Sequence, residues 1–243
     1  MINRKSAIEV GKVDEYYSYG PDDLDEDFKE KNKDILSRPR GNGYWLWKSY
    51  IINKTMVEKL NEGDYLIYTD AGTIYMNQSH ILIDFMIKNK FSIWANKLIC
   101  KESQYTKRDA FILMGVDMPF YRNSHQYIAT IQIYKKNEYS VKFIQEWLYY
   151  CQDKRIITDD NNTQGMPNFQ DFRDNRHDQS ILSLLIKKHG VANSGYPNKN
   201  LTELKPIIMP NIICVFRRFP FKDIEDLKNY CKKKLELQKT YYT

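Results

Sequence analysis

The stretch Gly63-Asp-Tyr-Leu-Ile-Tyr-Thr-Asp70-Ala-Gly72-Thr73 contains an apolar run that ends in a single acid, which two small residues follow. The run is short, rich in aromatic and branched residues and preceded by a turn pair, and this pattern predicts a buried strand. An acid at the carboxyl end of a buried strand lies where open α/β sheets bind their ligands, and the small residues let a ligand approach the backbone. A carboxylate there can hold a divalent metal ion or a ribose hydroxyl.

Helical and strand-like patterns alternate on both sides of this stretch, which predicts an α/β fold. With 243 residues and 42% hydrophobic content, the chain is long enough for one sizeable core, so we expect a single domain over residues 1–243. Helices are expected at 21–36, 49–60, 79–88, 138–151, 178–188 and 222–239, the last of them basic. Strands are expected at 127–134 and 207–209, a strand or extended segment at 91–100, and polar loops at 38–43 and 153–175.

The net charge of +6 leaves the class of partner open. Nucleic acid, anionic lipid and phosphorylated ligands all favour a basic surface. A codon bias that favours lysine, with the lysines scattered over a solvated surface, explains the same charge. Lys, Asn, Ile and Tyr are all common, and no long basic block stands out. No motif that reads nucleic acid is present, so we do not expect a nucleic-acid partner.

The four cysteines, Cys100, Cys151, Cys214 and Cys231, are widely spaced and form no CxxC pair. This spacing argues against a zinc site or a disulfide framework and favours a reduced compartment. No apolar run reaches the length of a membrane span, and the first residues lack a signal-peptide core. We therefore expect a cytoplasmic protein without a transmembrane segment, located in the host cytoplasm or the virion if the protein is viral.

Several classes of protein have an acid followed by a small residue at the end of a strand, which is the position expected for Asp70. Aspartic proteases need two such carboxylates that share a proton, and no second Asp-x-Gly follows an apolar strand in this chain. Haloacid-dehalogenase-type phosphatases need an acid two residues further on, where this chain has Gly72. Actin-like sugar kinases place the motif on an N-terminal hairpin, whereas a helix precedes it here. Glycosyltransferases that use nucleotide sugars remain, beside the plain alternative that Asp70 caps a turn.

The segment before the expected helix at 49–60 carries groups that suit a sugar nucleotide. Lys48, with Arg38 and Arg40 in the adjacent loop, would supply positive charge for a diphosphate. Tyr44, Trp45 and Trp47 offer flat faces for a base or a sugar ring. Core packing is the alternative for the aromatic residues, and we expect at least one of the two tryptophans to lie in the core.

A second group of polar residues, Arg176-His177-Asp178-Gln179-Ser180, begins the helix expected at 178–188. Polar groups at a helix N-terminus can point into a cleft, and an acid is favoured there by the helix dipole. A plain N-terminal cap is the alternative. These consecutive functional groups exceed what a cap requires.

The three motifs together resemble a group of GT-A-type glycosyltransferase-like proteins of giant viruses and of bacterial and eukaryotic glycan gene clusters. The strings that carry the resemblance are Arg40-Gly-Asn-Gly-Tyr-Trp-Leu-Trp-Lys48, the stretch that ends in Asp70-Ala-Gly72, and Arg176-His-Asp178-Gln179. Their order is also similar to that of glycogenin-like and mannosyltransferase families. The resemblance covers residues 20–190 and implies a Rossmann-like mixed sheet flanked by helices.

The resemblance implies a hexosyltransferase that uses a UDP- or GDP-sugar, a divalent cation (Mn²⁺ or Mg²⁺) and a glycan or protein acceptor. It places Asp70 at the metal ion and the diphosphate, and Asp178 with Gln179 at the reacting sugar and the acceptor, where an acid can act as general base. The implied substrate-binding residues are Lys48, Arg40, Trp47, Asp70, Gly72, Lys107, Asp109 and His177.

The chain departs from that family in two places. The usual Asp-x-Asp motif is Asp-Ala-Gly here, so one expected metal ligand is missing or comes from elsewhere. Residues 2–10 look like the helix that follows the first strand of a GT-A fold, so we expect that strand to be absent. A catalytically impaired protein that binds glycan or nucleotide through the same cleft is therefore the alternative to an active transferase.

Overall fold

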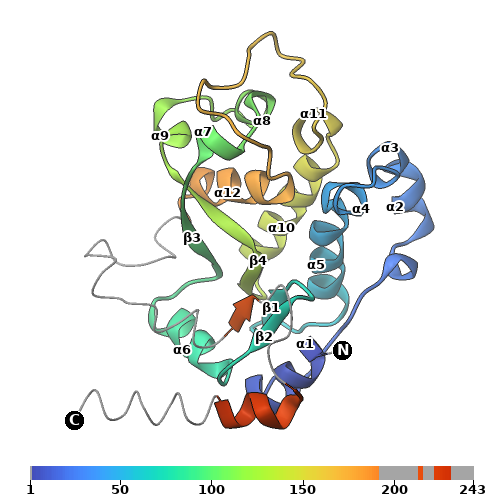
Figure 1. Cartoon of the computed structure of the whole chain (residues 1–243), viewed down its shortest axis with the longest axis vertical. Coiled ribbons are helices and arrows are strands. Elements are labelled where there is room, and N and C mark those ends of the chain that lie inside the picture. Colours follow the sequence, from blue (N-terminus) through green and yellow to red (C-terminus); the bar gives the residue numbers. More distant parts are fainter. Residues whose placement is uncertain (1, 192–212, 216–221, 231–243) are drawn as a thin grey trace. The chain divides into compact units, whose positions relative to one another are not determined.

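The computed structural model describes residues 2–191, 213–215 and 222–230 (Figure 1). The chain divides into two compact units, and each is described by itself. The larger unit comprises residues 19–68 and 91–197, and the smaller unit comprises residues 1–18, 69–90 and 198–243. The α/β class is confirmed, because helices and two small sheets make up the described residues. The single domain and the GT-A fold stay predictions.

The larger unit is built on a three-stranded antiparallel sheet in the order β1-β4-β3. The strands are β1 (Tyr65–Thr69), β3 (Ile93–Lys101) and β4 (His125–Lys135), and β4 is central. β1 was expected to be a buried strand, but all five of its residues are only half-buried because it lies at an edge of the sheet. The rule that places ligands at the carboxyl ends of parallel strands therefore does not locate Asp70 in this sheet.

Helices supply most of the regular structure of the larger unit. Those before the sheet are α2 (Glu26–Lys31), α3 (Lys33–Leu36), α4 (Gly41–Tyr44) and α5 (Leu46–Glu58), after a 3₁₀ turn at Pro21–Asp23. α7 (Glu102–Tyr105), α8 (Arg108–Leu113) and α9 (Pro119–Arg122) lie between β3 and β4. α10 (Glu138–Cys151), α11 (Lys154–Ile157) and α12 (Asp178–Lys188) follow β4. The helices at 138–151 and 178–188 match the predicted ranges.

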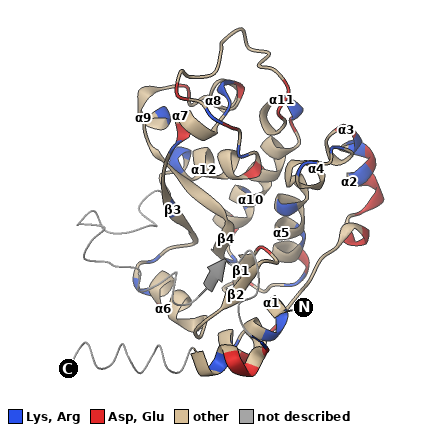
Figure 2. Ribbon diagram, viewed as in Figure 1, with Lys and Arg blue, Asp and Glu red and all other residues tan. Residues whose placement is uncertain are grey.

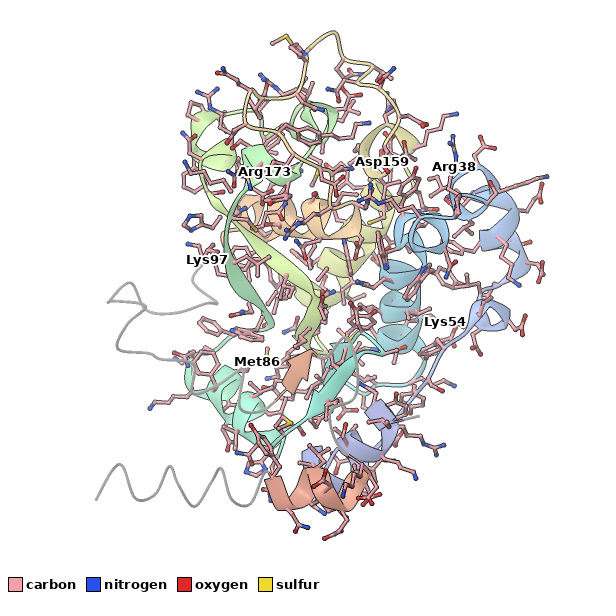
Figure 3. The ribbon with its side chains drawn as sticks, viewed as in Figure 1. Arg38, Lys54, Met86, Lys97, Asp159 and Arg173 are labelled. Atoms are coloured by element: carbon pink, nitrogen blue, oxygen red, sulfur yellow. The ribbon has the colours of Figure 1, made fainter. Side chains whose placement is uncertain are left out.

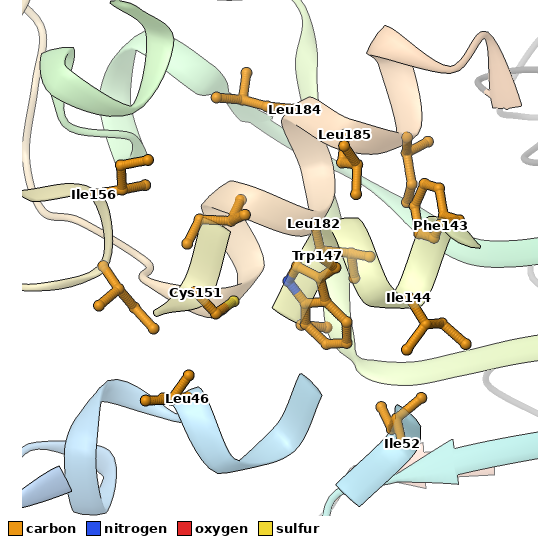
Figure 4. Close-up of a cluster of buried hydrophobic side chains, with 14 of the residues drawn as sticks. Leu46, Ile52, Phe143, Ile144, Trp147, Cys151, Ile156, Leu182, Leu184 and Leu185 are labelled. Atoms are coloured by element: carbon orange, nitrogen blue, oxygen red, sulfur yellow. The ribbon is translucent and has the colours of Figure 1, made fainter. Parts of the chain in front are cut away.

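The main core lies where α5, α10 and α12 meet (Figure 4). On α10, Phe143, Ile144, Trp147 and Cys151 share one face at helical spacing, and all four are fully buried. α12 is buried at nine of its eleven positions and also packs against β4. Because α12 is enclosed, the polar groups at its start are held in fixed positions.

The smaller unit contains α1 (Ile2–Ser6) with a π-helical turn (Ala7–Gly11), and α6 (His80–Lys88). A two-stranded antiparallel sheet pairs β2 (Thr73–Tyr75) with β5 (Ile213–Val215), and residues 224–230 are helical. The strand expected at 207–209 and residues 231–239 of the helix expected at 222–239 lie outside the described residues. Within the described part of the chain, no helix is long and apolar enough to cross a membrane.

Candidate functional site

The segment expected to be an irregular loop at 38–43 leads instead into one turn of left-handed helix. Residues 41–45 all have positive φ, from 49° at Asn42 to 89° at Gly43. The turn is closed by the amide of Tyr44, which donates to Arg40 O at 2.7 Å, and by that of Trp45, which donates to Gly41 O at 3.2 Å. Glycine and asparagine tolerate this conformation, but each other residue costs about 1–2 kcal/mol. The strain at Tyr44 and Trp45 therefore has to be offset by what their side chains contact.

Both rings contact His177, the residue just before α12. The ring centroids lie 4.7 Å apart for Tyr44–His177 and 5.6 Å apart for Trp45–His177. His177 is itself in an unusual backbone conformation, with φ 52° and ψ −117°. Strained residues persist only where the surroundings hold them, and they cluster at functional sites. Two strained segments that are distant in the sequence thus meet at one imidazole.

The hydrogen bond of His177 to Ile157 shows which ring nitrogen carries the hydrogen. Nδ1 lies 2.7 Å from Ile157 O, and because a carbonyl oxygen only accepts, Nδ1 carries the hydrogen. Burial lowers the pKa of the imidazole, which favours the neutral ring with a lone pair on Nε2. This atom is buried, has no hydrogen-bond partner among the described residues and lies 3.8 Å from Asp159 Oδ1.

Lys48 and Asp178, from two separate motifs, form a buried ion pair. Lys48 Nζ lies 3.0 Å from Asp178 Oδ2, and their side chains are 4% and 5% exposed. Lys48 Nζ also donates to Ala129 O at 3.4 Å and lies 5.5 Å from the centroid of the Tyr68 ring. Trp147 Nε1 donates to the backbone oxygen of Asp178 at 3.0 Å and so fixes the start of α12. The pair joins the first turn of α5 to the first turn of α12.

Gln179, predicted to act with Asp178, faces β4. Its Oε1 accepts from the amide of Ala129 at 3.3 Å, and its Nε2 donates to Gln126 Oε1 at 2.9 Å. Ala129 is thus contacted by Lys48 through its oxygen and by Gln179 through its amide. These bonds tie both motifs to the central strand.

Arg40 links the left-handed turn to the loop before α12. Its guanidinium contacts Asp159 at 3.0 Å and Asp174 at 2.7 Å, and the hydrogen bond with Asp174 raises the pKa of Arg40. Arg38 makes a longer contact of 3.5 Å with Asp160. Both arginines were expected to supply positive charge, but their aspartate partners were not predicted. The two adjacent acids at 159–160 are the feature of the sequence that could have indicated acidic partners for the arginines.

Lys107 and Asp109, expected to contact the donor sugar, hold the 158–164 loop. Lys107 Nζ donates to Asp160 O at 2.6 Å, and burial lowers the pKa of this lysine. The Asp109 carboxylate accepts from the amides of Thr163 at 2.6 Å and Gln164 at 3.1 Å. The predicted sugar contact stays a prediction, and the observed contacts give both residues a structural task.

The two tryptophans of the first motif are both only partly buried. Trp47 packs against the core of the larger unit, and its Nε1 donates to Gly41 O at 3.0 Å, which braces the left-handed turn. Trp45 stacks on His177 instead. The expectation of one tryptophan in the core thus holds only in part, through Trp47.

Asp70 lies in the smaller unit, at a turn that hydrogen bonds hold from both sides. Its backbone oxygen accepts from Thr73 N at 3.0 Å and from Thr73 Oγ1 at 2.8 Å. Asn3 Nδ2 donates to Thr73 O at 3.0 Å and to Thr69 Oγ1 at 3.2 Å. Asp70 is half-buried and Gly72 is exposed. Their contacts with metal ion and diphosphate stay predictions.

The comparisons with known proteins add no relative: the chain matches no family model, no curated protein and no solved structure. Among the described residues, no group of three or more His, Cys, Asp or Glu is arranged to hold a metal ion. The candidate site is therefore defined by its geometry, namely the buried Lys48–Asp178 pair beside the His177 cluster with Tyr44 and Trp45.

Proposed function

We propose that the protein is a nucleotide-sugar-dependent glycosyltransferase with a GT-A-like fold, which moves a hexose-type sugar to a hydroxyl acceptor. The observation that carries this proposal is the buried contact between Lys48 and Asp178. The residues come from the two motifs that the resemblance assigns to one reaction centre, and a chance resemblance gives no reason for them to meet. The ring contacts of Tyr44 and Trp45 with His177 are a second contact between the same motifs.

In the proposed reaction, an acceptor hydroxyl attacks the anomeric carbon, the bond from this carbon to the nucleoside diphosphate breaks, and the hydroxyl proton passes to the released diphosphate or to solvent. A fixed cation lowers the energy of the leaving diphosphate, and Lys48 is fixed by three contacts in a setting of low polarity. Asp178 keeps this ammonium charged by pairing with it. We assign Gln179 to orienting this first turn of α12 on β4.

A divalent cation would neutralise the charge of the leaving diphosphate. Magnesium is often held by one or two carboxylates together with substrate phosphates, and Asp70 offers one carboxylate at a braced turn. Its oxygen donor suits Mn²⁺ or Mg²⁺, but a single protein ligand makes the ion dependent on bound nucleotide. The roles of Asp70 at the metal ion and of Gly72 in close approach of the diphosphate are proposed from the resemblance alone.

The test measures thermal stabilisation and hydrolysis with a panel of UDP- and GDP-sugars, with and without manganese. We expect one donor to stabilise the protein more strongly with manganese. Hydrolysis should be lost in Asp70→Asn and in Asp178→Asn, and retained in Asp84→Asn, which changes an exposed aspartate on α6. Circular dichroism checks that each variant is folded. No stabilisation by any nucleotide would exclude the transferase.

A non-catalytic protein that binds nucleotide or glycan is the second candidate. It is favoured by the single carboxylate of the Asp-Ala-Gly motif and by the burial of Asp178, which leaves little of its side chain accessible. Stabilisation by a sugar nucleotide without hydrolysis or transfer to any acceptor would select it.

A further inference from the structure

One edge of the larger unit combines unpaired positive charge with exposed apolar side chains. β3 is an outer strand of its sheet, and alternate residues of a strand point to the same face. The pairing with β4 is irregular between Lys97 and Lys101, but Lys97, Ile99 and Lys101 are all exposed, with Ile99 at 88%, and they alternate with half-buried residues (Lys97 is labelled in Figure 3). An exposed aliphatic side chain therefore stands between two exposed lysines along this strand.

The segment around α9, which lies beside the end of β3, adds further exposed apolar side chains. The amide of Glu102, next to Lys101, donates to Ser124 O at 2.9 Å and joins the end of β3 to the segment after α9. On that segment Met118 is 51% exposed and Phe120 is 67% exposed. Figure 1 shows α7 and α9 together at this end of β3. We call Lys97, Ile99, Lys101, Met118, Phe120 and Arg122 the basic edge surface.

The positive charge of this surface is not balanced locally. Among the described residues, no carboxylate forms an ion pair with Lys97, Lys101 or Arg122. Glu102 is fully buried, where it binds Lys187. Burial lowers the pKa of His125, which pairs with Lys101 across the strands, and the charges of Lys97 and Lys101 lower this pKa further.

The loop before α12 adds cations at the same end of β3. Arg176 Nη1 lies 3.5 Å from Cys100 Sγ, and its guanidinium lies 4.0 Å from the centroid of the Tyr105 ring. The amide of Arg173 donates to Gln104 O at 2.8 Å, which places this exposed arginine beside α7 (Figure 3). Figure 2 shows both basic and acidic segments around α7. Asp174 is the acid nearest to them in the sequence and pairs with Arg40 at 2.7 Å, and Asp171 accepts from Ser103 Oγ at 2.8 Å.

We propose that the basic edge surface binds the surface of a bilayer that contains anionic lipids. Lysine and arginine near such a surface each contribute about 1 kcal/mol, while apolar side chains between them enter the boundary of the acyl region. Lysines on an outer strand also discourage pairing with another chain, but that role does not explain an exposed isoleucine and phenylalanine beside them. Aliphatic side chains such as Ile99 and Met118 offer no face for stacking on bases, which disfavours a single-stranded nucleic acid as the partner.

The test is co-sedimentation of the full chain with phosphatidylcholine vesicles, with and without phosphatidylserine. We expect binding only with phosphatidylserine, and a loss of affinity of at least about tenfold in Lys97→Glu/Lys101→Glu. The matched control is Lys33→Glu/Lys142→Glu, which changes the net charge equally at two lysines that are each 70% exposed on α3 and α10. The control should bind as the wild type does.

Ile99→Ser/Phe120→Ser separates insertion from simple charge attraction. We expect this variant to keep its attraction at low salt and to dissociate at high salt, where the wild type stays bound. Binding to neutral vesicles, equal losses in the control, tighter binding to random DNA, or no vesicle binding at all would each overturn the proposal. None of these results depends on transferase activity, so the outcome is independent of the proposed function.

Discussion

His177 is the residue at which burial, strain and hydrogen bonding combine. The Ile157 carbonyl fixes its hydrogen on Nδ1, and burial lowers its pKa below that of a free histidine. An imidazole that stays neutral in the folded protein takes up a proton on unfolding at mildly acidic pH. The residue therefore couples stability to pH.

The sign of this coupling gives the first prediction. The unfolded chain binds a proton at His177 below about pH 6.5, and the folded chain binds it only at lower pH. Stability should therefore be full above that pH and fall as the pH decreases, by at most about 1.4 kcal/mol per pH unit for one proton. Urea unfolding between about pH 7.5 and about pH 5.5 measures this slope.

His177→Asn should have a shallower slope than the wild type, because asparagine does not titrate and tolerates a positive φ. His80→Asn, which changes an exposed histidine on α6, should keep the wild-type slope. Equal slopes in the wild type and His177→Asn would show that the imidazole is not held neutral by the fold.

The Lys48–Asp178 pair gives the second prediction at this scale. Removal of one partner from a buried pair leaves an uncompensated charge, so Lys48→Met and Asp178→Asn should each cost about 3–5 kcal/mol of unfolding free energy. The double variant should cost less than the sum of the two by about 1–3 kcal/mol. Urea unfolding of the four proteins measures the coupling.

The exposed Glu138–Lys142 pair on α10 is the control for this cycle. Glu138→Gln and Lys142→Met should couple by only about 0.5 kcal/mol, because solvent screens the pair. Additive costs at Lys48 and Asp178 would contradict the buried ion pair.

Among the elements, the left-handed turn at 41–45 departs most from what its sequence predicts. Two glycines, an asparagine and a preceding proline predict a loop, but local sequence preference does not predict which conformation the loop adopts. Tyr44 and Trp45 adopt positive φ because their rings stack on His177, a contact that no local pattern contains. The conformation is thus decided by packing between distant elements.

Gly43→Ala tests this element. The residue has φ 89°, and a Cβ there would lie 2.7 Å from Leu36 Cα, so we expect a loss of about 2–4 kcal/mol from strain and overlap. Gly165→Ala is the matched control, with φ 73° and no atom within 4 Å of the added carbon, and should lose only about 1–2 kcal/mol. Thermal or urea unfolding compares the two, and equal losses would argue against the close packing at Gly43.

At the scale of the molecule, the two units differ in the chain segments that build them and in the size of their cores. The larger unit encloses the main core, whereas the smaller unit gathers segments from three parts of the chain. Its smaller cluster centres on Ile74, Met76 and Leu227. Most of the stabilising apolar burial that the structure describes thus belongs to the larger unit.

The alkylation rate of Cys151 measures how often that core becomes accessible to solvent. Cys151 is fully buried on α10, and burial raises the pKa of its thiol, so both access and thiolate formation are suppressed. Alkylation of the native protein, resolved for each cysteine by mass spectrometry, should be at least about a hundredfold slower at Cys151 than at half-buried Cys100. Similar rates at both would show that the α5–α10–α12 core opens locally.

The sequence by itself determined the elements whose pattern is local. The helices at 138–151 and 178–188 follow from apolar residues at helical spacing, and the strand at 65–69 follows from its short apolar run. It also singled out the residues that meet at the candidate site, Lys48, Arg40, His177 and Asp178, because consecutive polar groups beside apolar runs are visible without a structure.

Only the tertiary structure decided how these parts combine. It placed β1 at an edge of an antiparallel sheet, enclosed Lys48 with Asp178, and supplied Asp159 and Asp174 as the partners of Arg40. Sheet direction and charge pairing depend on contacts between distant residues, and a periodic pattern in one segment contains no information about its partner. The strained turn at 41–45 exists for the same reason, because its cost is offset by rings that meet only in the folded chain.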